Sequence, residues 1–275
     1  MQWKSSYFFF YKKKLDLGNP RTFNQKLQWL KLNDKKDIHT IMADKYQAKE
    51  FVAEALGKEY VIPTIKVYDR AEDIRFDELP DRFAIKCTHD SGSTFICRDK
   101  ELFEWKKIKK KLGRALSRNY FYRGREWPYK NIKPRIIVEP FLVDAEGNAV
   151  NDYKFYCFNG KPQFLYVSKG LDEHLTARLS FLTLDWQFAD FRRTDYPDLE
   201  KLPQKPEAYE DMLRCAEILC KGEKFVRVDF YCIGKQVLFS EFTFYPNGGL
   251  VHFEPQEYDL KLGDMLKLDD IKPNT

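Results

Sequence analysis

The chain has 275 residues, of which 43% are hydrophobic and 16% aromatic, and its formal net charge at pH 7 is +5. This length allows one large or two small domains with a sizeable core, and so modest a charge does not by itself indicate a nucleic-acid-binding protein. No run of about 18 apolar residues occurs, so no transmembrane helix is expected. The apolar stretch at residues 5–14 places its lysines after the aromatics, the wrong order for a signal peptide. Such a stretch is typical of a buried helical turn. The alternative is that residues 7–14 form an aromatic anchor at a membrane interface.

The cysteines are scattered through apolar, strand-like segments and form no CxxC pair. This pattern favours buried free thiols in a reducing cytoplasm over a disulfide framework or a zinc site. The six are Cys87, Cys97, Cys157, Cys215, Cys220 and Cys232.

The first half of the chain alternates predicted helices and strands. Thr22 is the expected N-cap of a first helix. A second helix is expected over 43–57, with Asp44 as its N-cap and Gly57 as its terminator. Strands are expected over 61–69 and over 82–99, the latter interrupted by a polar turn. A lysine-rich helix is predicted over 99–120.

The second half is richer in hairpins. A strand is predicted over 134–144, a hairpin around Asn159-Gly160, a helix over 206–222 and a last hairpin from residue 225. Because helices and hairpins mix irregularly, the pattern predicts α+β layers rather than a βαβ repeat.

The hairpin at 225–249, FVRVDFYCIGKQVLFSEFTFYPNGG, is the most informative segment. Alternation along a strand places Arg227 and Asp229 on one face. A three-residue loop over 233–235, with its glycine in the left-handed conformation, would pair the strands so that Asp229 faces Glu241 and Arg227 faces Thr243.

Two carboxylates that face each other repel unless a cation or a proton lies between them. Mg²⁺ suits such a pair, because it takes hard oxygen ligands and commonly combines one or two carboxylates with substrate phosphates. The hairpin therefore indicates a nucleotide-dependent enzyme. The alternative is a surface hairpin whose carboxylates pair with Arg227 or nearby lysines.

Three other segments could complete a nucleotide site. Lys86 ends a strand before a small, flexible turn whose backbone N–H groups could face phosphate oxygens. Glu139 ends an apolar strand that could offer backbone groups to an adenine ring, and Asp152 and Lys154 share a strand face suited to ribose and phosphate. Ordinary alternatives are an exposed lysine on a hairpin and salt bridges within a strand. The turn consists of Ser91, Gly92, Ser93 and Thr94.

Residues 106–135 contain twelve Lys or Arg and one acidic residue, Glu126, with aromatic residues interleaved. Such a stretch can bind nucleic acid or an anionic sugar polymer, because aromatic faces stack on bases and sugars. The alternative is a solvated helix face followed by a loop that packs on the core.

The order ADKYQAK, FAIK, IVEPFL, DYK, VRVDF and SEFTFYPNGG resembles the ATP-grasp fold. It is most similar to the TupA-like ATP-grasp family found in teichuronopeptide and capsular polysaccharide gene clusters, and the resemblance runs from Asn19 to Asp269. It implies an α+β fold in which two subdomains clamp Mg-ATP. The implied division is a reduced N-terminal helical segment at 1–40, a small subdomain at 41–138 and a large subdomain at 139–275.

The resemblance also implies residue roles. The phosphate-binding lysines would be Lys45 and Lys86, with Ser91 to Thr94 as the phosphate-covering turn, Glu139 on the adenine side and Asp152 at the ribose. The catalytic residues would be Arg227, which stabilises the transferring phosphoryl group, and Lys154. The metal ligands would be Asp229 and Glu241, assisted by Thr243 and Asn247. Two departures are that Thr243 stands where many ATP-grasp ligases have Asn, and Lys49 where Arg is expected.

The implied reaction is ADP-forming ligation of a carboxylate to an amine through an acyl phosphate, in cell-surface polysaccharide synthesis. The expected partners are an amino acid or other amine and an anionic glycan or its carrier, and no nucleic acid is expected. The expected location is the cytoplasm, with peripheral contact to the inner membrane face as a further option. Alternatives are a glycosyltransferase with a metal-bound sugar nucleotide and a non-catalytic polysaccharide-binding protein.

Overall fold

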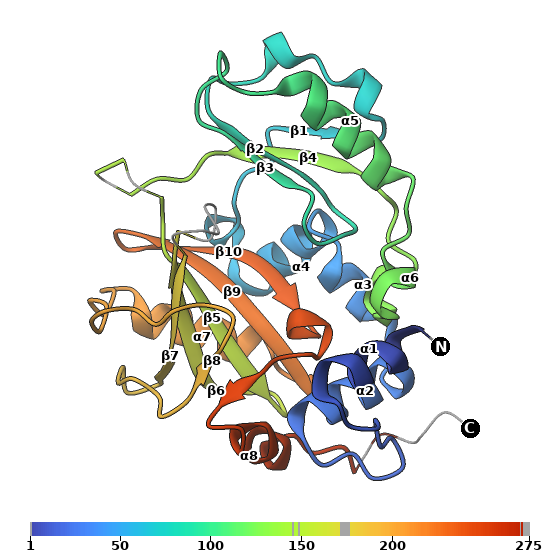
Figure 1. Cartoon of the computed structure of the whole chain (residues 1–275). Helices are drawn as coiled ribbons and strands as arrows, with labels where there is room; N and C mark the ends of the chain where they lie inside the picture. The colour runs from blue at the N-terminus through green and yellow to red at the C-terminus, as the bar shows by residue number, and fades with distance from the viewer. Residues whose placement is uncertain (1, 145, 148, 171–176, 270, 272–275) are drawn as a thin grey trace.

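The computed structural model describes residues 2–144, 146–147, 149–170, 177–269 and 271, and it contains two antiparallel sheets, each with its own core (Figure 1). The smaller sheet has the order β1-β4-β2-β3, and helix α5 packs against it in the upper part of Figure 1. The bounds of these elements are β1 Lys66–Tyr68, β2 Phe83–Cys87, β3 Thr94–Cys97, β4 Ile136–Pro140 and α5 Trp105–Leu116.

The larger sheet has the order β10-β9-β5-β6-β7 and lies below the smaller one in Figure 1. A two-stranded ladder of β8 and β11 stands beside it. The bounds are β5 Asp152–Phe158, β6 Lys161–Lys169, β7 Arg178–Thr183, β8 Arg192–Arg193, β9 Phe225–Ile233, β10 Gln236–Thr243 and β11 Phe253–Glu254. The α+β class predicted from the sequence is confirmed.

The remaining helices surround the larger sheet and the space between the sheets, and α3 and α4 lie between the two halves (Figure 1). Their bounds are α1 Gln2–Tyr11, α2 Phe23–Asn33, α3 Asp37–Ala43, α4 Gln47–Leu56, α6 Phe121–Gly124, α7 Tyr209–Leu219 and α8 Tyr258–Met265. Short 3₁₀ helices occur at Lys58–Tyr60, Ala71–Asp73, Phe76–Glu78, Trp127–Tyr129 and Pro246–Gly248.

Helix α2 begins as its sequence predicts. The Thr22 hydroxyl accepts a hydrogen bond from the Gln25 N–H, and the Gln25 side-chain oxygen accepts one from the Thr22 N–H, an arrangement that satisfies two otherwise free donors. The helix packs closely on α8, where a Cβ at Gly263 would come within 2.1 Å of the Arg21 carbonyl oxygen. Only glycine fits at that contact.

The helix predicted over 43–57 is shorter than expected at its start. Asp44 does not begin it, because its carboxylate accepts hydrogen bonds from the Tyr46 N–H and the Gln47 side chain in a turn that separates α3 from α4. The predicted terminator is confirmed, since Gly57 follows α4 with a φ of +118°, a conformation that side chains rarely adopt.

The two sheets group residues differently from the predicted division at two places. Helix α4, assigned to the small subdomain, contributes Ala48 and Val52 to the core of the larger sheet. Strand β4, whose Glu139 and Pro140 were assigned to the large subdomain, pairs with β2 in the smaller sheet. Both segments connect the two halves of the molecule. Each is close in sequence to the elements of one half and packs against the other half.

The sulfur chemistry agrees with the sequence, because all six cysteines are free and five are buried. Within the described part of the chain, no helix is long and apolar enough to cross a bilayer. In α1, Tyr7 is buried but Phe8, Phe9 and Phe10 are exposed, so contact of this segment with a membrane stays a prediction.

Candidate functional site

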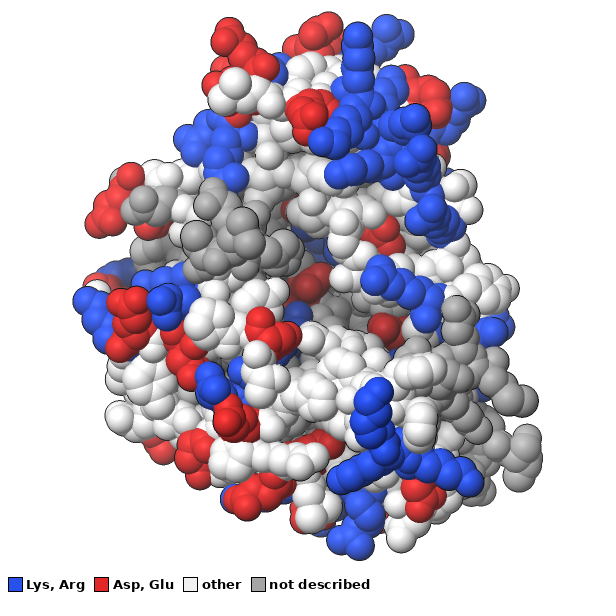
Figure 2. Space-filling view, viewed as in Figure 1, with Lys and Arg blue, Asp and Glu red and all other residues white. Residues whose placement is uncertain are grey.

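A cavity of about 830 Å³ lies between the two sheets, and a hollow is visible at the centre of Figure 2. The predicted site residues that line it come from both halves of the molecule. They are Lys86, Ser91, Gly92, Thr94, Glu139, Asp152, Lys154, Arg227, Glu241 and Asn247. Segments far apart in the sequence therefore meet in one cleft.

The upper wall carries a cluster of two lysines and one carboxylate. Glu139 is 3% exposed and forms ion pairs with Lys86, at 2.6 Å, and with Lys49. Burial alone would raise the pKa of Glu139, but the charges of Lys86 and Lys49 outweigh it and hold that pKa below its usual value. The cluster keeps one net positive charge at the cleft.

Lys49 shares this carboxylate with Lys86. The role of Lys45 as a phosphate-binding lysine stays a prediction. Lys45 lies at the nearby turn, where its backbone N–H donates to the Thr88 carbonyl at 3.1 Å and its ammonium group donates to the Asp90 carbonyl. Lys49 lies on α4, whereas Lys45 lies in the turn before that helix begins. The sequence signal for Lys49 was present, since it occupies the place where the family resemblance predicted an arginine.

The predicted phosphate-covering turn links β2 and β3 and reaches over the cleft. Ser93 donates a hydrogen bond to the Asp90 carboxylate, which fixes the base of the turn. Gly92 has a φ of +96°, and a Cβ there would contact nothing within 4 Å. The turn therefore needs glycine for its backbone conformation, and its tip is open to the cleft.

The lower wall is built by strands β5, β9 and β10. The loop of the last hairpin is shorter than predicted: two residues, Gly234 and Lys235, connect strands that pair Ile233 with Gln236. A bulge at Ser240 then shifts the register by one residue. The predicted pairing is nevertheless confirmed, with Asp229 opposite Glu241 and Arg227 opposite Thr243.

Asp229 is completely buried and held by two cations. Arg227 donates to both of its oxygens, at 2.7 Å and 2.5 Å, and Lys154 on the neighbouring strand donates to one at 3.0 Å. Burial would raise the pKa of Asp229, but Arg227 and Lys154 together lower it. The carboxylates of this hairpin do pair with Arg227, as the alternative reading supposed, but in a buried network rather than on a surface.

Two further carboxylates belong to the same network. Asp152 lies 3.0 Å from the Lys154 ammonium group, and its pKa is raised by burial despite that charge. Glu241 is one-third exposed and lies 3.6 Å from Arg227. Three carboxylates thus surround two cations, which leaves one net negative charge on the lower wall.

The two predicted auxiliary metal ligands have protein partners. The Thr243 hydroxyl accepts a hydrogen bond from Arg227 at 2.9 Å, and the Asn247 side chain donates to Asp195 at 3.2 Å. Thr243 therefore orients Arg227, and Asn247 lines the cleft from the turn that follows β10.

Sequence reasoning missed an arginine and three tyrosines on the lower wall. Arg193 is 4% exposed, is paired with Asp195 and lines the cleft from β8. Its guanidinium lies 6.0 Å from the Tyr166 ring centroid and 5.8 Å from that of Tyr196, and Tyr231 lines the same cleft. The short strand β8 carries no local motif, so only its pairing with β11 brings Arg193 to the site.

The depressed pKa values predict acid sensitivity. Glu139 and Asp229 have lower pKa values in the fold than in the unfolded chain, where they are about 4.3 and 3.9. Their contribution to the free energy of unfolding is therefore full above about pH 5 and is lost as pH falls below about 4. Urea unfolding should show the stability difference between the wild type and Glu139→Gln closing over that range. Glu257→Gln, which removes an exposed partner of Lys261, should show no such pH-dependent difference.

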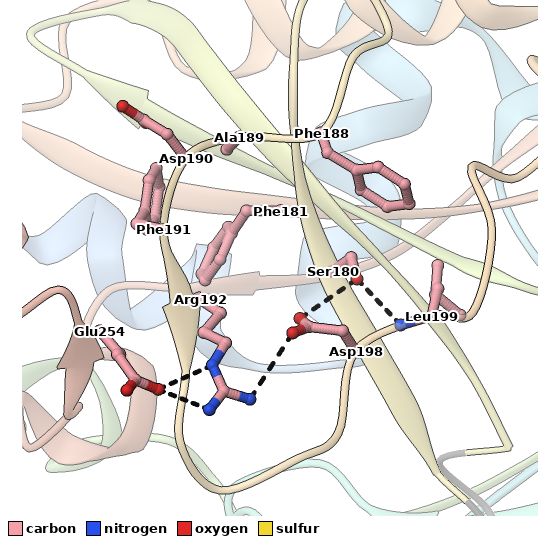
Figure 3. Close-up of a pocket in the computed structure, with 10 residues that line it drawn as sticks. All are labelled: Ser180, Phe181, Phe188, Ala189, Asp190, Phe191, Arg192, Asp198, Leu199 and Glu254. Atoms are coloured by element: carbon pink, nitrogen blue, oxygen red, sulfur yellow. Dashed lines mark hydrogen bonds and ion pairs between the residues drawn. The ribbon is translucent and has the colours of Figure 1, made fainter.

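A second pocket of about 330 Å³ lies beside β7 and β8 and contains no predicted site residue (Figure 3). Its floor is apolar, with Phe181 and Phe188, and its charged groups already have partners. Arg192 pairs with Glu254 at 2.5 Å and with Asp198 at 3.6 Å. These ion pairs join residues that line the pocket to one another, so the pocket is a feature of the packing around β8.

Several solved structures are similar to this chain at low sequence identity and at TM-scores below 0.5. A D-alanine–D-alanine ligase from Bacillus anthracis is 15% identical with a TM-score of 0.47, over 82% of this chain and 66% of that one. D-cycloserine synthetase DcsG is 14% identical with a TM-score of 0.43, over 84% and 72% of the two chains. An ATP-grasp RimK domain protein from Sphaerobacter thermophilus DSM 20745 is 12% identical with a TM-score of 0.41, over 83% and 69%.

The chain spans slightly less than two thirds of the Bacillus anthracis ligase. No curated protein matches the sequence. The family is given by a different comparison, in which the model of the TupA-like ATP-grasp family matches residues 25–267. That match covers both walls of the cleft and nearly the whole chain, and it agrees with the resemblance found in the motifs. The chain belongs to the TupA-like ATP-grasp family.

Proposed function

We propose that this protein is an ATP-dependent, ADP-forming carboxylate–amine ligase. The observation that carries the proposal is the pair of facing clusters in one cleft. The cluster around Glu139 keeps a net positive charge, and the network around Asp229 keeps a net negative charge. A magnesium–polyphosphate complex has the complementary arrangement of charges.

The upper wall suits the polyphosphate. Lys86 lies beside the turn at 91–94, so its ammonium group and the backbone N–H groups of the turn can neutralise phosphate oxygens from the same side. Glu139 is held between Lys49 and Lys86, so its role is to fix these lysines at the cleft. In this proposal Lys45 supports the base of the turn, where it already contacts the Asp90 carbonyl.

The lower wall suits Mg²⁺. Asp152 and Glu241 line the cleft with hard oxygen ligands of the kind this ion prefers, combined with phosphate oxygens. Asp229 lies buried behind them, held by Arg227 and Lys154. The negative charge of the three carboxylates exceeds that of the two cations among them by one, so a divalent ion is an acceptable neighbour. Bound there, Mg²⁺ would neutralise charge on the phosphates during transfer.

The reaction then needs two bond exchanges. A carboxylate oxygen of the first substrate attacks the γ-phosphorus, the bond to the β–γ bridging oxygen breaks, and ADP leaves. An amine nitrogen attacks the resulting acyl carbon, the carbon–oxygen bond to phosphate breaks, and an amide, phosphate and one proton are formed. Arg227 lies between the cleft and the hairpin carboxylates, where it can stabilise the transferring phosphoryl group.

The carboxylate substrate is proposed to be a uronic acid unit of an anionic glycan or of its carrier, in cell-surface polysaccharide synthesis. Lysine and arginine side chains gather over α5 at the upper right of Figure 2. Beside them, a hollow of about 870 Å³ runs from the turn at 91–94 to residues 120–123. Its cations and aromatic rings suit an anionic sugar chain. They are Lys111, Arg114, Arg118, Tyr120, Tyr122 and Arg123.

A thermal-shift titration with ATP, Mg²⁺ and UDP-sugars tests the nucleotide assignment. A ligand that binds only the folded state stabilises it by about 2.7 kcal/mol at one hundred times its Kd. We expect a rise in Tm with ATP that depends on Mg²⁺. A rise with a UDP-sugar and none with ATP would overturn the proposal in favour of a glycosyltransferase.

A further inference from the structure

A second chamber, of about 520 Å³, adjoins the nucleotide cleft on the far side of the last hairpin. It shares Ser91, Arg227, Glu241 and Asn247 with that cleft, so the two spaces meet where phosphoryl transfer would occur. Its other walls come from α2, from the segment 120–129 and from the turn after β10. The polar residues there include Gln28, Lys31, Tyr120, Arg123, Glu126 and Tyr245.

Glu126 is the most unusual residue of this chamber. It is 9% exposed, yet within the described part of the chain its carboxylate forms no hydrogen bond and has no cation within ion-pair distance. Burial raises its pKa, with Lys31 and Arg123 acting in the opposite direction from greater distance. A buried carboxylate without a direct partner is costly, and the chamber is the space in which a ligand could supply one.

Two cations lie near Glu126. Lys31 is 4% exposed and donates a hydrogen bond to the Gly248 carbonyl at 2.7 Å, while no carboxylate of the described residues pairs with it. Because an ammonium group has three N–H donors, Lys31 can also face an anion in the chamber. Arg123 lines the same wall. The wall formed by α2 and residues 120–129 thus presents two positive groups and one negative group.

We propose that this chamber binds the amine substrate and that the substrate is an α-amino acid. Its ammonium group would pair with Glu126, and its carboxylate would face Lys31 and Arg123. The assignment rests on the proposed ligase function and names one substrate class for that site. An amine without a carboxylate would leave the two cations unmatched, which is why an amino acid fits better.

The position of the chamber also indicates which residue would accept the proton that the amine must lose. Arg227 and Glu241 line both spaces, so an amine held by Glu126 would lie in the chamber that meets the nucleotide cleft at these residues. The bound ammonium group must first lose one proton to become a nucleophile, and Glu126 is the carboxylate placed beside it to accept that proton. The nitrogen loses a second proton, to the departing phosphate or to water, when the amide bond forms. The first transfer is ordinary general-base chemistry for a buried glutamate.

Saturation-transfer NMR with the wild-type chain, Mg²⁺ and a non-hydrolysable ATP analogue tests the assignment. The probes are the twenty standard amino acids, the D-enantiomers of the chiral ones and D-glucosamine, an amine that lacks a carboxylate. We expect at least one amino acid to bind more tightly than D-glucosamine. Its Kd should rise at least tenfold in Glu126→Gln, a change that keeps the shape of the side chain and removes its charge.

The matched control is Glu257→Gln on α8, whose side chain is 63% exposed and pairs with Lys261. It should bind the same amino acid as the wild type does. The assignment is overturned if no amino acid binds although the ATP analogue does, if D-glucosamine binds best, or if Glu126→Gln binds as tightly as the wild type. Failure of the ATP analogue itself to bind would instead contradict the proposed ligase function.

Discussion

Asp229→Ala should lower the free energy of unfolding by about 3–5 kcal/mol at pH 7, the range observed when one partner of a buried ion pair is removed. The carboxylate is completely buried and is the shared partner of Arg227 and Lys154. Its loss would leave Arg227 without its two-point contact and Lys154 with Asp152 alone. Urea unfolding followed by circular dichroism measures the change.

Asp69→Ala is the matched control, because it removes an aspartate that also pairs with a lysine. Asp69 and Lys133 are 2.9 Å apart, but both side chains are 60% exposed, and exposed pairs contribute little. Its unfolding curve should overlay that of the wild type. Equal stability of Asp229→Ala and the wild type would contradict the buried network described here.

Arg227→Lys should reduce kcat by about a thousandfold or more, the effect seen when an arginine that stabilises phosphoryl transfer is lost. Lysine keeps the positive charge but cannot donate to both oxygens of Asp229 and to Thr243 at once. Because Lys86 and the turn at 91–94 remain in place, binding of ATP should change far less than turnover. ADP release under saturating substrates, together with ATP titration, separates the two effects.

Arg192→Lys is the matched control. It makes the same substitution at another arginine that pairs with a carboxylate. Arg192 is 45% exposed and contacts Glu254 outside the nucleotide cleft. Its kcat should equal that of the wild type. Turnover by Arg227→Lys at the wild-type rate would remove Arg227 from the mechanism.

The fold and the lower wall of the cleft could largely be predicted from the sequence. Alternation along a strand places Arg227 and Asp229 on one face, and hairpin pairing brings Glu241 opposite Asp229. Both rules are local, so they act without knowledge of the rest of the chain. The loop length was nevertheless wrong, since two residues rather than three connect the strands, and the bulge at Ser240 is what brings Glu241 opposite Asp229. Bulges have no reliable sequence signal.

The upper wall and the second chamber could not be predicted in the same way. Glu139 meets Lys49 across about 90 positions of sequence, because the packing of α4 on the larger sheet brings Lys49 to the strand that carries Glu139. Glu126 appeared in the sequence only as the single acid of a basic segment. Its burial beside Lys31 depends on the packing of residues 120–129 against α2, which no local pattern specifies.

The ion pairs of Glu139 have a mechanical consequence. Lys86 belongs to the smaller sheet, whereas Lys49 belongs to a helix that packs in the core of the larger one. Glu139 therefore links the two halves of the molecule at one end of the cleft. It lies on β4, the last strand of the smaller sheet before the chain enters the larger one. A rotation that keeps these pairs intact opens the cleft at the turn of residues 91–94 and leaves the Glu139 end closed. Nucleotide exchange would then begin with movement of the turn that covers the phosphates, while Lys86 and Lys49 stay paired with Glu139.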